Sequence, residues 1–272
     1  MAERDAAFVG SIPEYYDRYL GPLFFREYAE AMAARLHVVP GMRVLETACG
    51  TGIVTEPLVA RLAGGGSLVA TDLNTPMLAY AAAKLSAAEG IAWKEADATN
   101  LPFDDRSFDA VVCQFGLMFF PDKLAGVREA LRVLKPGGRF LVSVWDRLDD
   151  NPVPRITHDT VATFFPSDPP QFYTIPFSLH DVAVVRGLLE SAGFEGIEWE
   201  RLDATGTSPS ASEAARGLIE GNPIYLAIME RRSSALADIE AAVAGKLAEA
   251  LGDRPLRCPL KAIFFGGRRP MV

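Results

Sequence analysis

Three polar features that follow apolar runs in the first half of the chain could together hold a nucleotide-sized ligand. A short apolar run leads into Glu46 and then into the glycine turn at 50–52. Asp72 ends a second apolar run, and Asp97 follows a third. An apolar strand that enters a Gly-x-Gly turn opening a helix builds such a site at the carboxyl edge of an α/β sheet. The order of these residues therefore predicts a ligand site at one edge of a parallel sheet.

The carboxylate of Glu46 indicates which ligand the turn accepts. A carboxylate just before the loop would repel a pyrophosphate, whereas it would attract the cationic amino-acid end of a ligand. The third small residue of a dinucleotide fingerprint is also missing, because Thr55 occupies its position. S-adenosylmethionine has the required cationic end, and it has a ribose whose hydroxyls suit Asp72. The residues thus favour S-adenosylmethionine over NAD, while a simple helix N-cap is the alternative role for Asp72.

The composition restricts the class of protein and its partners. The 272 residues are 49% hydrophobic and 23% charged, which is enough to bury a sizeable core. The net charge of −8 and the lack of a long basic run argue against nucleic acid as a partner. The three cysteines form no Cys-x-x-Cys pair, so we expect neither a disulfide framework nor a metal site, and a reducing compartment fits. The chain starts without an apolar signal segment and has no run of membrane-spanning length, so we expect a cytoplasmic enzyme without a membrane span.

Apolar runs alternate with helical patterns along much of the chain. We expect five strands in the first part, at residues 43–49, 67–73, 91–96, 108–115 and 139–145. Helical segments separate several of them, at residues 52–62, 75–89 and 121–134. Units of strand, helix and strand build a parallel sheet through right-handed crossovers. With two further strands at 197–203 and 260–265, the predicted fold is α/β. It has a Rossmann-like, mainly parallel seven-stranded sheet, helices on both faces and helical lid insertions.

Segments outside this pattern are expected to cover the site. A capping box at Ser11 predicts a short helix that stops at Gly21-Pro22, before a second helix over 23–38. Residues 147–177 are rich in proline and aromatic residues and are expected to form a lid. Three helical pieces are expected within an insertion at 207–257. The expected organisation is an N-terminal helical cap (1–40), a cofactor-binding core (41–146), and a remainder (147–272) holding the lid, the last strands and the helical insertion.

Five motifs stand in a characteristic order along the chain. They are Val44-Leu45-Glu46-Thr47-Ala48-Cys49-Gly50-Thr51-Gly52, Ala70-Thr71-Asp72-Leu73-Asn74-Thr75-Pro76-Met77, Ala96-Asp97-Ala98, Leu101-Pro102-Phe103 with Ser107-Phe108-Asp109, and Leu134-Lys135-Pro136-Gly137-Gly138. Together they resemble the class I S-adenosylmethionine-dependent methyltransferases, in particular those of the ubiquinone/menaquinone-biosynthesis type. The resemblance covers residues 11–145 well and extends to the order of the later elements. The chain departs from the family at Ala48, where glycine is common, and this tightens the room at the methionine end.

The resemblance implies a complete site for S-adenosylmethionine as cofactor. Glu46 and the backbone from Ala48 through Gly50 to Gly52 would hold the methionine portion, and Asp72 would bond the ribose hydroxyls. The other residues implied to contact the cofactor are Tyr16 over the site, Leu73 and Met77 on the adenine face, Asp97 with Ala98 at the adenine amino edge, and Gln114 with Phe115 beside the sulfonium. For Tyr16, simple packing of an amphipathic helix is the alternative role.

The sequence contains no obvious catalyst. Methyl transfer from a sulfonium is an in-line displacement in which the protein supplies alignment, and a base is needed only when the acceptor must lose a proton. The catalytic residues therefore stay unknown, and the weak candidates are His158, His180 and Tyr16.

The acceptor is expected to be a small, partly apolar or aromatic metabolite that is methylated on O, N or C. Aromatic residues of the lid and of the N-terminal helix are expected to line its pocket: Tyr15, Tyr19, Phe164, Phe172 and Tyr173. The alternative is a protein of the same fold that binds S-adenosylmethionine for a cyclase or decarboxylase reaction, or for regulation, because fold does not fix function. The sequence names neither the acceptor nor the oligomeric state, and a homodimer is left open.

Overall fold

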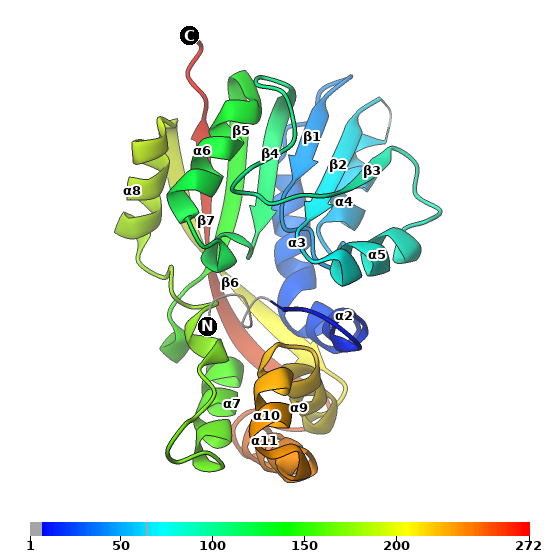
Figure 1. Cartoon of the computed structure of the whole chain (residues 1–272), viewed down its shortest axis with the longest axis vertical. Coiled ribbons are helices and arrows are strands. Elements are labelled where there is room, and N and C mark those ends of the chain that lie inside the picture. Colours follow the sequence, from blue (N-terminus) through cyan, green and yellow to red (C-terminus); the bar gives the residue numbers. More distant parts are fainter. Residues whose placement is uncertain (1–6, 64) are drawn as a thin grey trace.

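A seven-stranded sheet forms the centre of the computed structural model, which describes residues 7–63 and 65–272 (Figure 1). The strands are β1 (Arg43–Glu46), β2 (Ser67–Asp72), β3 (Ile91–Glu95), β4 (Phe108–Gln114), β5 (Leu134–Trp145), β6 (Glu195–Ser208) and β7 (Leu256–Arg268). Their spatial order is β3-β2-β1-β4-β5-β7-β6. The first five strands run parallel, and β7 runs antiparallel to both β5 and β6. The predicted α/β fold with a mainly parallel seven-stranded sheet is therefore confirmed.

Helices cover both faces of this sheet, as predicted. One face carries α3 (Arg26–Ala34), α4 (Thr55–Leu62) and α5 (Thr75–Lys84), and the other carries α6 (Lys123–Val133) and α8 (Val182–Ala192) (Figure 1). The central strand β4 is accordingly apolar in its middle, where residues 110–113 are fully buried. This burial on two sides fixes where the strands end, and hence where the loops at the carboxyl edge begin.

A second group of helices faces the carboxyl ends of the parallel strands. Strands β6 and β7 continue as an antiparallel pair beyond β5, which pairs with β7 only as far as Trp145 opposite Ala262. Around this projecting pair lie α7 (Pro152–Thr163), α9 (Ala211–Glu220), α10 (Ile224–Arg232) and α11 (Leu236–Leu251) (Figure 1). Both expected insertions thus contribute helices to one group. The site must lie between this group and the sheet.

The two late strands are longer than the sequence predicts, and the lid is more regular. The alternation of apolar residues ends near Asp203, yet ladder pairing continues to Ser208. Glycine is needed within this extension, because a Cβ at Gly206 would lie 2.0 Å from the Leu23 carbonyl oxygen. In the lid, Pro152 begins α7 instead of breaking a helix. A proline is tolerated in the first turn because the amide there has no partner within the helix.

The N-terminal region corrects one prediction. Helix α2 (Ile12–Tyr15) continues directly into the π-helix η1 (Tyr16–Phe25) and then into α3, so the chain does not stop at Gly21-Pro22. The wider π-turn accommodates the proline, and the amide of Arg26 donates to the carbonyl of Gly21, five residues back. Ser11 is also helical and makes no side-chain cap, so the capping box is absent. Residues 1–6 of the expected cap lie outside the described residues.

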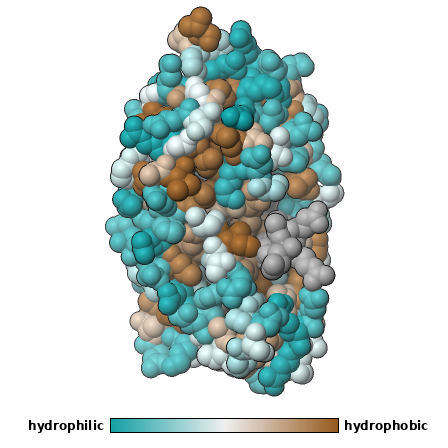
Figure 2. All heavy atoms as spheres, turned by 60° about the vertical axis from the view of Figure 1, so that its left-hand side comes forward, coloured by the Kyte–Doolittle hydropathy of each residue, from teal (hydrophilic) through white to brown (hydrophobic). Residues whose placement is uncertain are grey.

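The surface is mostly polar, with apolar residues between the polar ones. In the view of Figure 2, the apolar residues gather in the upper half of the molecule and at its middle. Apart from Met271 and Val272, the large apolar side chains that are most exposed, such as Val39, Leu73 and Val184, belong to different segments. No helix within the described residues is long and apolar enough to cross a membrane.

Candidate cofactor and acceptor site

The loop after β1 forms a backbone cradle at the carboxyl edge. Strand β1 ends at Glu46, and the chain then takes positive φ angles of 53° at Ala48, 55° at Gly50 and 77° at Gly52. A left-handed backbone costs an alanine roughly 1 kcal/mol, so Ala48 is held there by its surroundings. A Cβ at Gly52 would lie 3.2 Å from Ala81 and Leu85, which shows that this glycine serves close packing against α5.

Asp72 at the end of β2 locks this loop in place. Its Oδ2 accepts a hydrogen bond from the amide of Gly50 at 2.8 Å, and its Oδ1 accepts one from the amide of Asn74 at 2.8 Å. Burial raises the pKa of the Asp72 carboxyl above its ordinary value, although these hydrogen bonds oppose the shift. Oδ1 also accepts from the Asn74 Nδ2 at 3.4 Å, so the second lone pair of Oδ2 is the one that can still accept from a ligand hydroxyl.

A cavity of about 130 Å³ opens between this cradle and the loop after β4. Ten of the predicted cofactor residues line it: Tyr16, Ala48, Gly50, Asp72, Leu73, Met77, Asp97, Ala98, Gln114 and Phe115. The other lining residues were not predicted from the sequence: Phe8, Asn74, Ala96, Gly116, Phe119, Phe120 and Pro121. The aromatic pair at 119–120 was a signal that could have been used, since it directly follows the turn after β4. Two predicted residues, Glu46 and Gly52, do not line the cavity.

Glu46 lies behind the loop rather than in the cavity. Its side chain is almost fully buried, and its Oε2 accepts a hydrogen bond from the Thr55 hydroxyl at 2.7 Å. The Glu46 side chain points to the start of α4, because β1 ends at Glu46 and the following loop crosses over this side chain. Burial raises the pKa of Glu46 from 4.5 to about 8, against the lowering effect of its hydrogen bond from Thr55. Direct contact with a ligand ammonium, as the sequence suggested, would need the loop or the side chain to move.

The residues present nevertheless fit S-adenosylmethionine. Gln114 lines the cavity, and its Oε1 atom is buried and has no hydrogen-bond partner within the described chain, so it could accept from an ammonium group. The Oδ1 of Asp97 accepts from the amide and the hydroxyl of Thr99 at 2.8 and 2.7 Å. This leaves the second oxygen of Asp97 for the amino group of an adenine.

The N-terminal π-helix is fastened over the cradle through Asp17. Its Oδ1 accepts a hydrogen bond from the Thr51 hydroxyl at 2.9 Å and from the Lys84 ammonium at 2.6 Å. Asp17 is 9% exposed, so the ion pair is largely shielded from solvent. The contact joins three elements, and it sets Tyr16 at the wall of the cavity.

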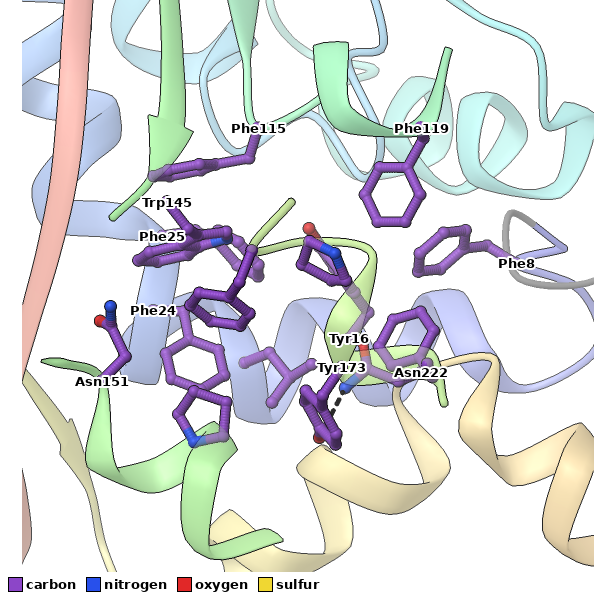
Figure 3. A pocket seen from close by; sticks show the side chains of 15 residues that line it. Phe8, Tyr16, Phe24, Phe25, Phe115, Phe119, Trp145, Asn151, Tyr173 and Asn222 are labelled. Carbon is purple, nitrogen blue, oxygen red and sulfur yellow. Dashed lines mark hydrogen bonds between the residues drawn. The ribbon is translucent and has the colours of Figure 1, made fainter. Parts of the chain in front are cut away.

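A second, aromatic chamber adjoins the cofactor cavity (Figure 3). The two share four lining residues, Phe8, Tyr16, Phe115 and Phe119. The further lining residues are Leu20, Phe24, Phe25, Trp145, Asn151, Pro154, Phe172, Tyr173, Pro176, Phe177 and Asn222. Phe115 stacks on Trp145 with centroids 4.0 Å apart, and Tyr16 stacks on Phe25 at 4.8 Å. The chamber is small, with a volume of about 50 Å³.

Few polar groups reach this acceptor chamber. Asn151 uses its side chain to bond the backbone of Arg147 and Lys261. The Tyr173 hydroxyl donates to the Leu218 carbonyl at 2.7 Å, and burial raises the pKa of this hydroxyl far above its usual range. Burial likewise raises the pKa of Tyr16, helped by the nearby Asp72 carboxyl. Among the described residues that line the chamber, none carries a carboxylate, imidazole or ammonium group.

Three predicted acceptor and catalytic residues lie at the chamber and five do not. Tyr16, Phe172 and Tyr173 line it. Tyr15 and Tyr19 lie on another side of the helix, where their ring centroids are 5.7 Å apart. Phe164 packs against the core beyond α7. The Nδ1 of His180 lies 2.9 Å from the Phe177 carbonyl, and the Nδ1 of His158 is buried on α7 without a partner in the described chain. The sequence missed Phe24, Phe25 and Trp145, which resemble ordinary core residues.

The comparisons with known proteins agree with this arrangement. A model of the methyltransferase domain family matches residues 45–142. The ubiquinone/menaquinone biosynthesis C-methyltransferase UbiE of Idiomarina loihiensis is 33% identical over 178 residues, covering 60% of this chain and 70% of that protein. The demethylmenaquinone methyltransferase of Corynebacterium kroppenstedtii is 32% identical over 186 residues, covering 64% and 77%.

Solved structures show the same fold at low sequence identity. The phosphoethanolamine N-methyltransferase 2 of Haemonchus contortus, in complex with S-adenosylhomocysteine, superposes with a TM-score of 0.61 at 18% identity and covers 95% of this chain and 57% of its own. The [4+2]-cyclase SpnF superposes with a TM-score of 0.57 at 22% identity, covering 91% and 82%. The latter shows again that this fold alone does not determine the reaction.

A Rossmann-like sheet with a glycine-containing loop at its carboxyl edge is typical of enzymes that bind a nucleotide-containing cofactor, and this protein has that arrangement. Within this class, the chain belongs to the class I S-adenosylmethionine-dependent methyltransferases of the ubiquinone/menaquinone-biosynthesis type. It is a methyltransferase that uses S-adenosylmethionine as its cofactor and a small molecule as its acceptor.

Proposed function

We propose that this enzyme methylates a ring carbon of a reduced quinone precursor that carries an apolar chain. The observation that carries the proposal is the aromatic chamber, which shares Tyr16, Phe115 and Phe119 with the cofactor cavity. An aromatic ring held there would lie next to the end of the cofactor site formed by Gln114 and Phe115. The names of the relatives, a C-methyltransferase of ubiquinone/menaquinone biosynthesis and a demethylmenaquinone methyltransferase, support this acceptor class.

The cofactor's position is part of the same proposal. Gly50 and Ala48 would present backbone groups to the methionine portion, Asp72 would accept from the ribose hydroxyls, and Asp97 would accept from the adenine amino group. When bound, S-adenosylmethionine supplies a methyl group whose bond to sulfur breaks as the acceptor's electron pair forms the new bond, which leaves S-adenosylhomocysteine. The protein's part is to align the two partners and to exclude water.

No base lines the chamber among the described residues, and this supports a carbon nucleophile that is activated by its own ring oxygens. Both tyrosines at the chamber, Tyr16 and Tyr173, have raised pKa values and stay protonated, so neither removes a proton from the acceptor. A hydroquinone places electron density on its ring carbons without such help, and it can release its ring proton to water after the transfer. An alcohol acceptor would instead need a base at the reacting oxygen.

The acceptor ring must displace side chains to enter. A cavity of about 150 Å³ is what benzene fills in an engineered protein core, whereas the chamber here holds about 50 Å³. We therefore propose that Tyr16 and its stacking partner Phe25 move with the π-helix when the acceptor binds.

The test is an assay with labelled S-adenosylmethionine and a panel of reduced acceptors. We expect methyl incorporation into a short-chain 2-prenyl-1,4-naphthohydroquinone or a polyprenyl benzohydroquinone, with stoichiometric S-adenosylhomocysteine. Transfer to catechol, amine or carboxylate acceptors but to neither hydroquinone would reject the acceptor class and keep the methyltransferase.

The cytoplasm as location and a homodimer as assembly also remain proposals. The three cysteines are buried and unpaired, which suits a reducing compartment. Fractionation of cells that express the tagged chain tests the first, and light scattering of the purified protein tests the second.

A further inference from the structure

Among the polar side chains that line the acceptor chamber but not the cofactor cavity, two have a group without a hydrogen-bond partner in the described residues. The hydroxyl of Tyr16, which lines both cavities, also has no partner there. Asn151 has both ends of its amide bonded to backbone, and the Tyr173 hydroxyl both donates and accepts. The exceptions are the Oδ1 atom of Asn222 and the indole N–H of Trp145. Neither makes a hydrogen bond within the part of the chain that the structure describes, although both side chains line the chamber and are over 90% buried.

The orientation of the Asn222 amide is fixed by its neighbours. Its Nδ2 donates to the Leu218 carbonyl at 3.1 Å and to the Tyr173 hydroxyl at 3.4 Å. Tyr173 itself donates to the same Leu218 carbonyl, so that oxygen is an acceptor for both groups. A flipped amide would set two acceptor oxygens against each other at 3.1 Å, which excludes this alternative. Oδ1 is therefore the end that remains to accept a hydrogen bond.

The Trp145 indole is held equally firmly. It is the last residue of β5, stacks on Phe115 at 4.0 Å with an interplanar angle of 5°, and meets Tyr28 and Phe24 edge to face. An indole nitrogen is a donor only, and a buried one normally has a partner. In Figure 3, Trp145 and Asn222 lie on opposite sides of the chamber, with aromatic rings between them.

We propose that Trp145 and Asn222 are the polar anchors that position the acceptor, an inference that rests on the proposed function. The indole N–H donates to one ring oxygen, and Asn222 Oδ1 accepts the hydroxyl proton of the other. A donor and an acceptor on opposite walls match a ring with two oxygens on opposite carbons. The two anchors differ in what they recognise, because a carbonyl oxygen can accept from Trp145 but has no proton to give to Asn222. Asn222 thus selects the reduced ring over the oxidised one.

The experiment compares binding of the reduced and the oxidised form of one probe. The probe is 2-geranyl-1,4-naphthoquinone and its hydroquinone, titrated anaerobically by calorimetry into the protein saturated with S-adenosylhomocysteine. For the unmodified protein we expect about tenfold tighter binding of the hydroquinone, as befits one buried hydrogen bond. Asn222→Ala should bring this ratio close to one. Trp145→Phe should weaken both forms about equally, roughly tenfold, and keep the ratio.

The comparison of two ligands on one protein removes general effects of folding from the result. Trp199→Phe is the matched control, because Trp199 is 44% exposed and lies outside the chamber; its affinities should be unchanged. The anchors are rejected if Asn222→Ala keeps the tenfold preference or if Trp145→Phe abolishes it. If neither form binds the unmodified protein, the proposed acceptor class fails instead. Binding of both forms with equal affinity would reject the selective role of Asn222 and leave the acceptor class intact.

Discussion

Ala48 and Gly116 meet face to face where the loop after β1 approaches the loop after β4. A Cβ atom placed on Gly116 would lie only 2.5 Å from the Cβ of Ala48 and 3.0 Å from the Sγ of Cys113. The methyl group of Ala48, at the position where glycine is common among family members, is thus accommodated by the missing side chain at 116. The two residues line the cofactor cavity together, so their contact sets its width at the proposed methionine end.

This contact predicts the effect of substitutions on both sides of it. Gly116→Ala should destabilise the protein by about 1–3 kcal/mol through overpacking, and it should weaken S-adenosylhomocysteine binding. Ala48→Gly alone should hardly change the stability, because the loss of the methyl contact is offset by the better fit of glycine to the positive φ. The double variant should recover at least half of the lost stability, measured by urea denaturation. Equal damage in the single and double variants would show that Cys113, and not Ala48, limits the space.

Removing the Asp72 carboxylate should weaken cofactor binding more than folding. Asp72→Ala is expected to cost about 1.5–3 kcal/mol of S-adenosylmethionine affinity, the range for hydrogen bonds to a charged group. Because Asp72 also holds the amides of Gly50 and Asn74, some loss of stability accompanies it. Asp72→Asn is the control for shape. Its affinity for S-adenosylmethionine should lie between that of the unmodified protein and that of Asp72→Ala. Unchanged affinity for Asp72→Ala in calorimetry would remove Asp72 from the proposed site.

Glu46 predicts a pH dependence of stability. Its pKa is about 8 in the folded protein against an ordinary 4.5, so the folded state holds one more proton than the unfolded state between these values. Stability is therefore full below pH 4.5, falls as the pH rises to 8, and levels off above it. The loss is on the order of 5 kcal/mol at 1.36 kcal/mol per pKa unit. Glu46→Gln should flatten much of this slope in denaturation curves recorded from pH 5 to 9.

The same residue should couple cofactor binding to a proton. If an ammonium group approaches Glu46, the bound state favours the carboxylate, so binding at pH 7 releases a proton. Calorimetry in buffers of different ionisation enthalpy should detect the release, and Glu46→Gln should abolish it. Glu240 is the matched control, since its pKa is also raised, to about 7, but it lies on α11 beside Glu220. Proton release that persists in Glu46→Gln would exclude this role for Glu46.

The fold was predictable because its signals are local. Glycine turns and apolar runs mark β1 and β2, and the hydroxyl of Ser210, a residue type that commonly caps helices, accepts from the amide of Glu213 at the start of α9. The π-helix was not predictable, because Gly21-Pro22 normally ends a helix and only the tertiary packing over α9 keeps it continuous. That packing is close: a Cβ on Gly217 would lie 2.4 Å from Tyr19.

The cofactor cavity was easier to predict than the chamber. Residues of the cavity, such as Asp72 and Asp97, directly follow strands, so their edge is known from the order of the elements. The chamber combines Phe24, Trp145 and Asn222 from three distant segments, and nothing in their local sequence distinguishes them from core residues. The direction of the Glu46 side chain could not be predicted either. The end of a strand shows that a residue lies at the carboxyl edge of the sheet, but it does not show which way the side chain points.

The ion pair that fastens the π-helix should matter for cofactor retention. Lys84→Met removes the partner of Asp17 while keeping the length of the side chain, and it leaves a largely buried carboxylate bonded only to Thr51. We expect a loss of about 1–3 kcal/mol in stability and faster dissociation of S-adenosylhomocysteine in stopped-flow experiments. The double variant Asp17→Asn/Lys84→Met should be less damaged than the sum of the single variants. Strict additivity would mean that the pair contributes no coupling.

Ring removal should separate the chamber from the rest of the core. Phe172 is 3% exposed and belongs to the main core, so Phe172→Ala is expected to lose about 3–5 kcal/mol of stability wherever the acceptor binds. Stability alone therefore cannot identify the pocket. Phe194→Ala is the matched control, because Phe194 is 4% exposed and stacks on Phe140 at 5.5 Å, outside both cavities. Both variants should be equally destabilised.

The kinetics of the folded fraction then distinguish the two positions. Phe172→Ala should raise the KM for the naphthohydroquinone acceptor at least tenfold and leave the KM for S-adenosylmethionine unchanged, since Phe172 lines only the acceptor chamber. Phe119→Ala should raise both KM values, because Phe119 lines both cavities. Phe194→Ala should change neither once the concentration of folded enzyme is taken into account. If Phe172→Ala and Phe194→Ala behave alike in these assays, the aromatic chamber is a part of the core, and the acceptor binds elsewhere along the carboxyl edge of the sheet.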